Sequence, residues 1–136
     1  MTKAYSLHDC RATRMELADD TLSFYFENGV FLLPAEGGEP QRSGPARLDI
    51  PILDRDTDGI SVYIYKPHRG RVVRKEWEAG NFADAVNDGS FELEFLTEYT
   101  AYRSLLYRCV VWFDTPPYHH DCDIELNSFG AKLTLL

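Results

Sequence analysis

The chain has 136 residues, enough for one domain with its own hydrophobic core, and its hydrophobic fraction of 44% is that of an ordinary globular protein. Its net charge of −8 argues against general binding to a nucleic-acid backbone, because that affinity comes from cationic side chains. The sequence has neither an apolar run approaching the ~20 residues of a membrane span nor a secretory signal at its start. We therefore expect a single cytoplasmic domain, residues 1–136, that binds neither nucleic acid nor membranes.

The first part of the chain shows the period-two alternation of half-buried strands. Apolar and polar residues alternate over 13–17 and again over 22–27. Asn28 and Gly29 follow, a pair that favours the positive φ angles of a two-residue hairpin turn. This turn predicts that a strand over 30–33 pairs with 22–27.

The rest of the chain continues as short strands separated by turns. Residues 34–45 are rich in Gly and Pro and are expected to form a loop. Further strands are expected at about 47–53, 61–66, 71–77, 91–95, 104–113, 123–126 and 131–135. One short helix is expected over 81–87, capped by Asn81 and ended by Gly89. About ten short strands and one short helix predict a mainly β fold, either a β-sandwich or a strongly curved, partly closed antiparallel sheet.

A His-Asp-Cys tripeptide occurs twice, at residues 8–10 and 120–122. If the two segments were neighbours, two histidines and two cysteines could hold zinc tetrahedrally. The candidate ligands are His8, Cys10, His120 and Cys122. Their spacing differs from that of standard zinc motifs, and the alternative is turn chemistry with the cysteines packed as small apolar residues. No other cofactor is expected, and three cysteines in a chain of this type favour free thiols.

Residues 54–59 resemble the opening of an EF-hand calcium loop, with acidic residues at alternate positions followed by glycine. Tyr65 stands at the twelfth position, where such a loop needs a bidentate Glu. An ordinary hairpin turn is therefore the better explanation of this segment.

Charged residues of opposite sign gather in two places. The positive set is Lys66, His68, Arg69, Arg71, Arg74 and Lys75. It is expected to be a solvated hairpin whose charges discourage edge pairing, with an acidic partner or phosphate as the alternative. Glu92 and Glu94 alternate with Phe91, Leu93 and Phe95, which places the glutamates away from the core. There they suit plain solubility, or a docking surface for a basic partner, better than acid-base catalysis.

The segment Leu7-His8-Asp9-Cys10, the expected hairpin over 19–29 and the later stretches 106–109 and 117–119 together resemble small uncharacterised β-rich bacterial proteins. Some of those proteins are similar in build to the immunity proteins of toxin systems. The resemblance implies a non-enzymatic role, and it carries over no catalytic residue to this chain.

The leading hypothesis is a non-enzymatic binding domain that presents an acidic surface to a protein partner, as an immunity protein would. This hypothesis fits the negative charge and the lack of standard catalytic motifs. One alternative is a metal- or small-ligand-binding β protein, or an enzyme, with a cavity lined by Tyr63, Tyr65, Tyr99, Tyr102, Tyr107 and Trp112. Another is a homo-oligomer joined through strand edges.

Overall fold

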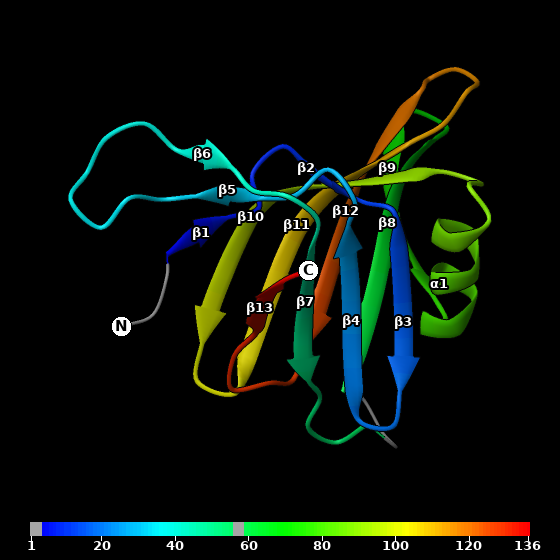
Figure 1. The fold of residues 1–136 in the computed structure, drawn as a ribbon. Coiled ribbons are helices and arrows are strands. Elements are labelled where there is room, and N and C mark those ends of the chain that lie inside the picture. Colours follow the sequence, from blue (N-terminus) through cyan, green and yellow to red (C-terminus); the bar gives the residue numbers. More distant parts are fainter. Residues whose placement is uncertain (1–3, 56–58) are drawn as a thin grey trace.

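The computed structural model describes residues 4–55 and 59–136, which form strands and one short helix (Figure 1). The strands of the first half are β1 (Tyr5–Ser6), β2 (Cys10–Ala12), β3 (Arg14–Ala18), β4 (Thr21–Phe26), β5 (Phe31–Leu32), β6 (Gln41–Arg42), β7 (Ala46–Pro51) and β8 (Ile60–His68). The second half consists of β9 (Arg71–Trp77), α1 (Ala79–Asn87), β10 (Glu92–Ala101), β11 (Ser104–Trp112), β12 (His119–Leu126) and β13 (Lys132–Leu135). No helix in the described part is long and apolar enough to cross a membrane.

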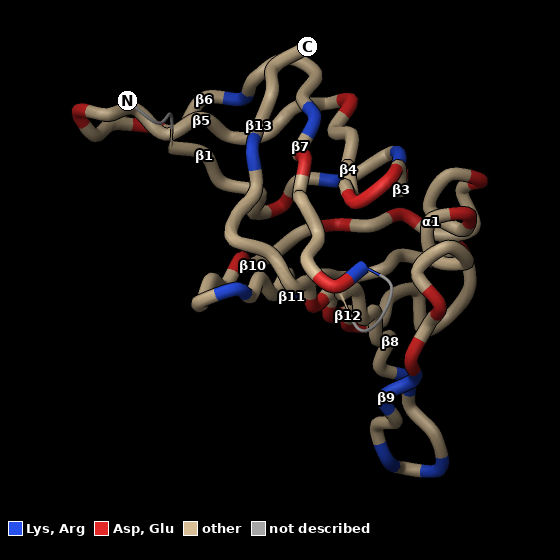
Figure 2. The backbone as a smooth tube through the Cα atoms, turned by 90° about the horizontal axis from the view of Figure 1, so that it is seen from below, with Lys and Arg blue, Asp and Glu red and all other residues tan. Residues whose placement is uncertain are grey.

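Two antiparallel sheets lie face to face as the layers of a β-sandwich (Figure 2). One sheet has six strands in the order β2-β10-β11-β12-β8-β9, and the other has four in the order β13-β7-β4-β3. The short strands β1, β5 and β6 form a third sheet that projects from one end of the sandwich (Figure 1). The prediction of a mainly β fold with one short helix is confirmed, and of the two architectures considered the sandwich is the one observed.

The alternating apolar residues of the two sheets meet in the core between them. Phe95 of β10 lies at its centre, with its ring centroid 5.0 Å from that of Phe24 and 5.4 Å from that of Phe26, both on β4. The Tyr107 ring of β11, the neighbouring strand of the same sheet, is 5.3 Å from that of Phe95. All four side chains are buried, so Phe95 joins the two layers through edge-to-face aromatic contacts.

The helix α1 begins earlier than the sequence predicted. Its N-cap is Glu78, whose carboxylate accepts hydrogen bonds from the backbone N–H groups of Gly80 and Asn81. The prediction that Asn81 caps the helix is therefore wrong, because Glu78 already satisfies the first free N–H groups. Gly89 ends the helix as predicted, with a φ of +78° that suits glycine.

The expected pairing of residues 30–33 with 22–27 is also wrong. Both edges of β4 are occupied by longer strands, β3 and β7, whereas β5 pairs with β1 and β6. Gly29 has the positive φ of a turn, +79°, and a Cβ atom there would lie 2.2 Å from the carbonyl oxygen of Ser43. Glycine thus lets the chain leave the sandwich at this point and enter the small third sheet.

Candidate functional site

The structure does not bring the two His-Asp-Cys segments together. Cys10 begins β2 and Cys122 lies on β12, with β10 and β11 between them. Three strand spacings of roughly 4.8 Å place these backbones about 14 Å apart. His8 is exposed in the turn before β2 while Cys10 is buried, and His120 and Cys122 lie on the far side of that gap. Within residues 4–55 and 59–136, no group of three or more His, Cys, Asp or Glu side chains is placed to hold a metal ion.

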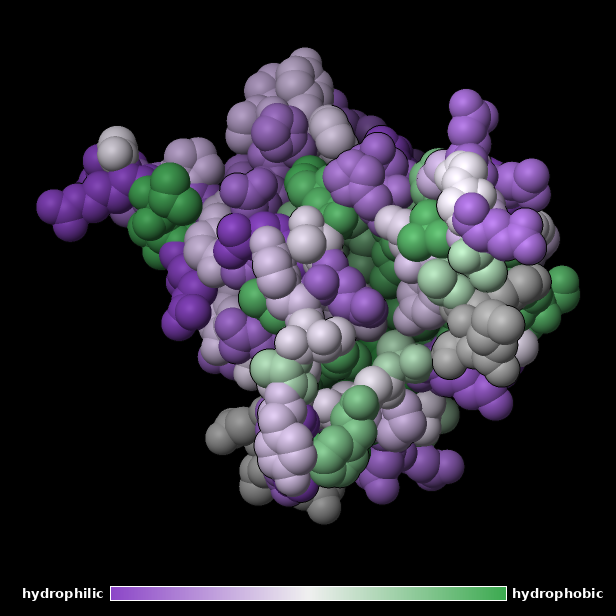
Figure 3. Space-filling view, turned by 90° about the vertical axis from the view of Figure 1, so that its left-hand side faces the viewer, coloured by the Kyte–Doolittle hydropathy of each residue, from purple (hydrophilic) through white to green (hydrophobic). Residues whose placement is uncertain are grey.

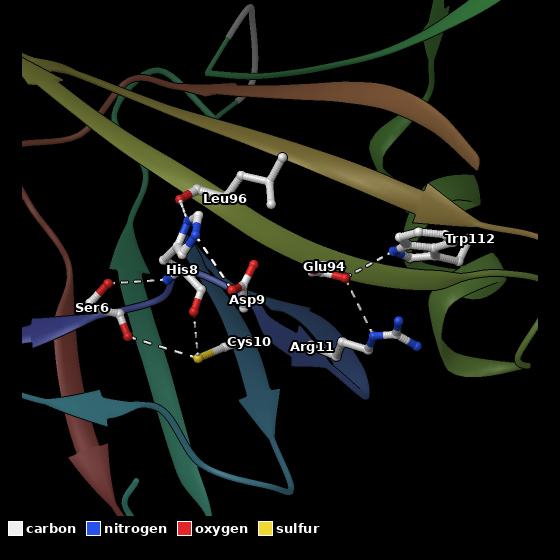
Figure 4. A network of polar contacts seen from close by, with 8 residues as sticks. All are labelled: Ser6, His8, Asp9, Cys10, Arg11, Glu94, Leu96 and Trp112. Atoms are coloured by element: carbon white, nitrogen blue, oxygen red, sulfur yellow. Dashed lines mark hydrogen bonds and ion pairs between the residues drawn. The ribbon is translucent and has the colours of Figure 1, made fainter. Parts of the chain in front are cut away.

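The side chains around His8 are held by local contacts (Figure 4). His8 Nδ1 donates to the carbonyl oxygen of Leu96 at 2.8 Å, and its Nε2 lies 3.4 Å from the Asp9 carboxylate. The Cys10 thiol points to the backbone carbonyls of Ser6 and His8, at 3.8 and 3.6 Å, and not to the imidazole. Burial raises the pKa of this thiol, so His8 and Cys10 do not form an activated nucleophile pair.

A cleft of about 450 Å³ opens beside His8, at the base of the small third sheet. Its walls combine apolar side chains with two carboxylates and an imidazole. The lining residues are Ser6, His8, Asp9, Phe31, Leu33, Glu39 and Pro40. Figure 3 views this end of the molecule and shows hydrophobic surface within a hollow that is bordered by hydrophilic groups. The chemistry of this lining suits a small cation with an apolar body.

The six-stranded sheet has a second face, which points away from the core and which no described helix or strand covers (Figure 2). Because side chains alternate along each strand, the residues on this second face are those that come before and after the buried residues in the sequence. We call this surface the outer face, formed by Arg11, Tyr63, Tyr65, Arg74, Glu92, Glu94, Tyr99, Arg108, Trp112, His119, Asp121, Asp123 and Glu125.

Asp123 is the centre of one network on the outer face and is only 4% exposed. Its carboxylate accepts from the Tyr65 hydroxyl at 2.7 Å and from Arg108 Nε at 3.1 Å. The hydrogen bond to Asp123 raises the pKa of both Tyr65 and Arg108. Beside them the guanidinium of Arg74 lies over the Tyr63 ring at 4.1 Å. Residues from four adjacent strands are thus fixed in one arrangement.

A second network on the same face joins β2, β10 and β11 at the other side of the sheet. It is formed by Arg11, Glu94 and Trp112 (Figure 4). Trp112 Nε1 donates to the Glu94 carboxylate at 2.9 Å, and Arg11 Nε is 3.5 Å from the same carboxylate. The Trp112 ring packs against His119, with 5.1 Å between the ring centroids. The indole is therefore held in one orientation while part of its surface stays exposed.

Sequence reasoning placed Glu92 and Glu94 on the side away from the core, and the burial pattern of β10 agrees. It missed the Asp123 network, because Tyr65 and Asp123 are 58 residues apart and only the order of the strands brings them together. The six aromatic residues proposed to line a cavity do not share one. Tyr107 is in the core, while most of the others lie on the outer face. The calcium-like segment 54–59 falls partly outside the described residues.

Comparison with known proteins identifies no relative. No protein-family model matches the chain, and no curated protein or solved structure gives a match.

Proposed function

We propose that the chain is a non-enzymatic binding domain whose acidic outer face docks on a basic protein partner, as the immunity proteins of toxin systems dock on theirs. The observation that carries the proposal is an uncovered six-stranded sheet whose exposed side carries tyrosine, tryptophan and arginine side chains that are held by hydrogen bonds and ring contacts. These three residue types dominate the binding energy of protein interfaces.

The side chains of this face are ordered before any partner arrives. Asp123 holds Tyr65 and Arg108, and Glu94 holds Trp112. Side chains that are already fixed lose little conformational entropy on binding, which favours affinity. Acidic side chains outnumber the arginines on this face, so a basic surface would approach it faster than a neutral one.

Photo-crosslinking in cells that express the protein natively tests the proposal. A benzoylphenylalanine residue replaces Tyr63 or Tyr99 on the outer face, and in the matched control it replaces Tyr25 on the exposed side of the four-stranded sheet. We expect adducts with one basic protein from the two outer-face positions and none from Tyr25.

Charge reversal on the same face gives the second readout. Asp121→Lys with Glu125→Lys should abolish the adduct, because both side chains are exposed on the outer face. The control pair, Glu16→Lys with Glu27→Lys, makes the same change in net charge on β3 of the four-stranded sheet and in the turn after β4. It should leave the adduct intact. Adducts of equal yield from Tyr25, or none from any position, would contradict the proposal.

The cleft beside His8 supports a second candidate function, the binding of a small organic cation. Asp9 and Glu39 supply negative charge, while Phe31 and Leu33 supply apolar surface. Titration with benzamidine, followed by NMR, should shift the amide signals of the lining residues, and neutral benzamide should not. Equal shifts from both compounds would sink this candidate.

A further inference from the structure

Positive charge is concentrated in the hairpin formed by residues 66–75, which we call the basic arm. The arm contains five Lys or Arg residues and no Asp or Glu. Since the whole chain carries −8, the rest of the molecule carries −8 − 5 = −13. The five cations are Lys66, Arg69, Arg71, Arg74 and Lys75. The net charge of the arm is therefore opposite in sign to that of the rest of the molecule.

The basic arm extends beyond the sandwich (Figure 2). Pairing between β12 and β8 ends at Ile64, whereas β8 and β9 continue to pair up to His68 and Arg71. Beyond Ile64, four residues of each strand thus pair only with each other, an overhang of about 13 Å at roughly 3.3 Å per residue. This length exceeds the Debye length of about 8 Å at physiological ionic strength, so the negative body is largely screened from the end of the arm.

The cations of the arm are not neutralised by the carboxylates of the described chain. Arg11, Arg14, Arg47, Arg103 and Arg108 each form an ion pair with an Asp or Glu. None of the ion pairs found among residues 4–55 and 59–136 includes a cation of the arm. Lys66 and Arg74 instead lie over the rings of Phe113 and Tyr63. Attraction for an external anion is thus retained.

Apolar surface and an unused backbone edge accompany this charge. Val72 is 72% exposed and Val73 is 44% exposed, and both lie on β9, the last strand of its sheet. Hydrophobic surface stands beside hydrophilic groups on the projection at the left of Figure 3. A phosphate backbone would leave these valines without partners, whereas an extended protein segment can pair with the edge and cover them.

We propose that the basic arm binds an acidic protein segment in extended conformation, added as a strand beside β9. The carboxylates of that segment lie against Arg71, Arg74 and Lys75, and its apolar side chains contact the two valines. Repulsion between cations prevents two arms from pairing with each other, while a negatively charged strand meets no such penalty. This site shares Arg74 with the outer face but is opposite to it in charge preference, and it does not depend on the proposed function.

The test uses an acetylated and amidated ten-residue peptide of alternating Glu and Val, titrated into the full chain and followed by NMR. We expect chemical-shift changes and slower amide exchange confined to residues 66–77. Replacing every Glu of the peptide by Gln should weaken binding at least tenfold. Raising the sodium chloride concentration from 50 to 500 mM should also weaken it, as screening requires.

Matched variants separate the arm from the rest of the surface. Arg71→Glu with Lys75→Glu should weaken peptide binding at least tenfold, whereas Arg14→Glu with Arg47→Glu, the same change in net charge on the four-stranded sheet, should leave it within twofold. Dispersed amide spectra show that each variant is folded. Equal weakening by both pairs, no binding at millimolar peptide, or tighter binding of a ten-base-pair DNA duplex would overturn the proposal.

Discussion

At the scale of single residues, Asp123 shows how one carboxylate organises the outer face. It is nearly inaccessible to solvent yet lies on the side of the sheet away from the core, covered by the Tyr65 and Arg108 side chains that it binds. We expect Asp123→Asn to lower the free energy of unfolding by about 1–3 kcal/mol, because charged hydrogen bonds to a desolvated group are replaced by weaker ones. Asp49→Asn, at a carboxylate side chain that is 24% exposed where that of Asp123 is 6% exposed, should cost less than about 1 kcal/mol in the same urea titration. Equal losses would argue against a special role for Asp123.

The lowered pKa of His120 predicts that the protein is less stable at low pH. Burial, and then the positive charge of Lys66, lower the pKa of His120 below its ordinary value of 6.5. As the pH falls through 6.5, the unfolded chain therefore takes up the proton first, and folding is weakened. His120→Gln should reduce the loss of melting temperature between pH 7.5 and pH 5, whereas His119→Gln on the outer face serves as the control. If both variants keep the wild-type pH profile, His120 is not responsible for it.

At the scale of elements, α1 protects an edge of the four-stranded sheet. Asn87 at its end forms two hydrogen bonds with the backbone of Met15 on β3, accepting from the N–H at 2.8 Å and donating to the carbonyl at 2.9 Å. We expect Asn87→Ala to destabilise the fold by about 1–3 kcal/mol and to speed hydrogen exchange at Met15, because a buried edge loses its partner. Asn81→Ala, an exposed change on the same helix, should leave both unchanged. The same acceleration in both variants would mean that helix stability alone is being measured.

The elements also show what sequence reasoning can and cannot provide. Strong alternation predicted the strands around Phe24, Ile64 and Phe95, because the period of two follows from the pleat itself. Turn chemistry was less informative. Asn28 and Gly29 do turn the chain, but β3 and β7 already pair with both edges of β4. The sequence around the turn does not show that these two strands occupy the edges. The hydrogen bonds of the outer face also depend on the order of the strands. The alternation along each strand could therefore be predicted from the sequence, but the contacts between strands could not.

At the scale of the whole molecule, the two layers depend on a small aromatic centre. Phe95→Ala removes contacts to Phe24, Phe26 and Tyr107 together, and we expect it to cost about 3–5 kcal/mol in a urea titration. Phe129→Ala makes the same chemical change at a side chain that is 68% exposed, and it should stay within about 0.5 kcal/mol of wild type. Similar losses in the free energy of unfolding at the two positions would mean that the aromatic contacts of Phe95 do not hold the two sheets together.

The position of the basic arm in the chain has a consequence for a broken backbone. A protease cut at Arg69 would divide the chain into two fragments near its middle, within the overhang and outside the core. The first fragment supplies β3, β4 and β7 to the four-stranded sheet and β2 and β8 to the six-stranded sheet. The second fragment supplies β13 to the four-stranded sheet and β9, β10, β11 and β12 to the six-stranded sheet. Each sheet would then contain strands from both pieces. The nicked protein should remain assembled, and the two fragments should recombine from separate solutions.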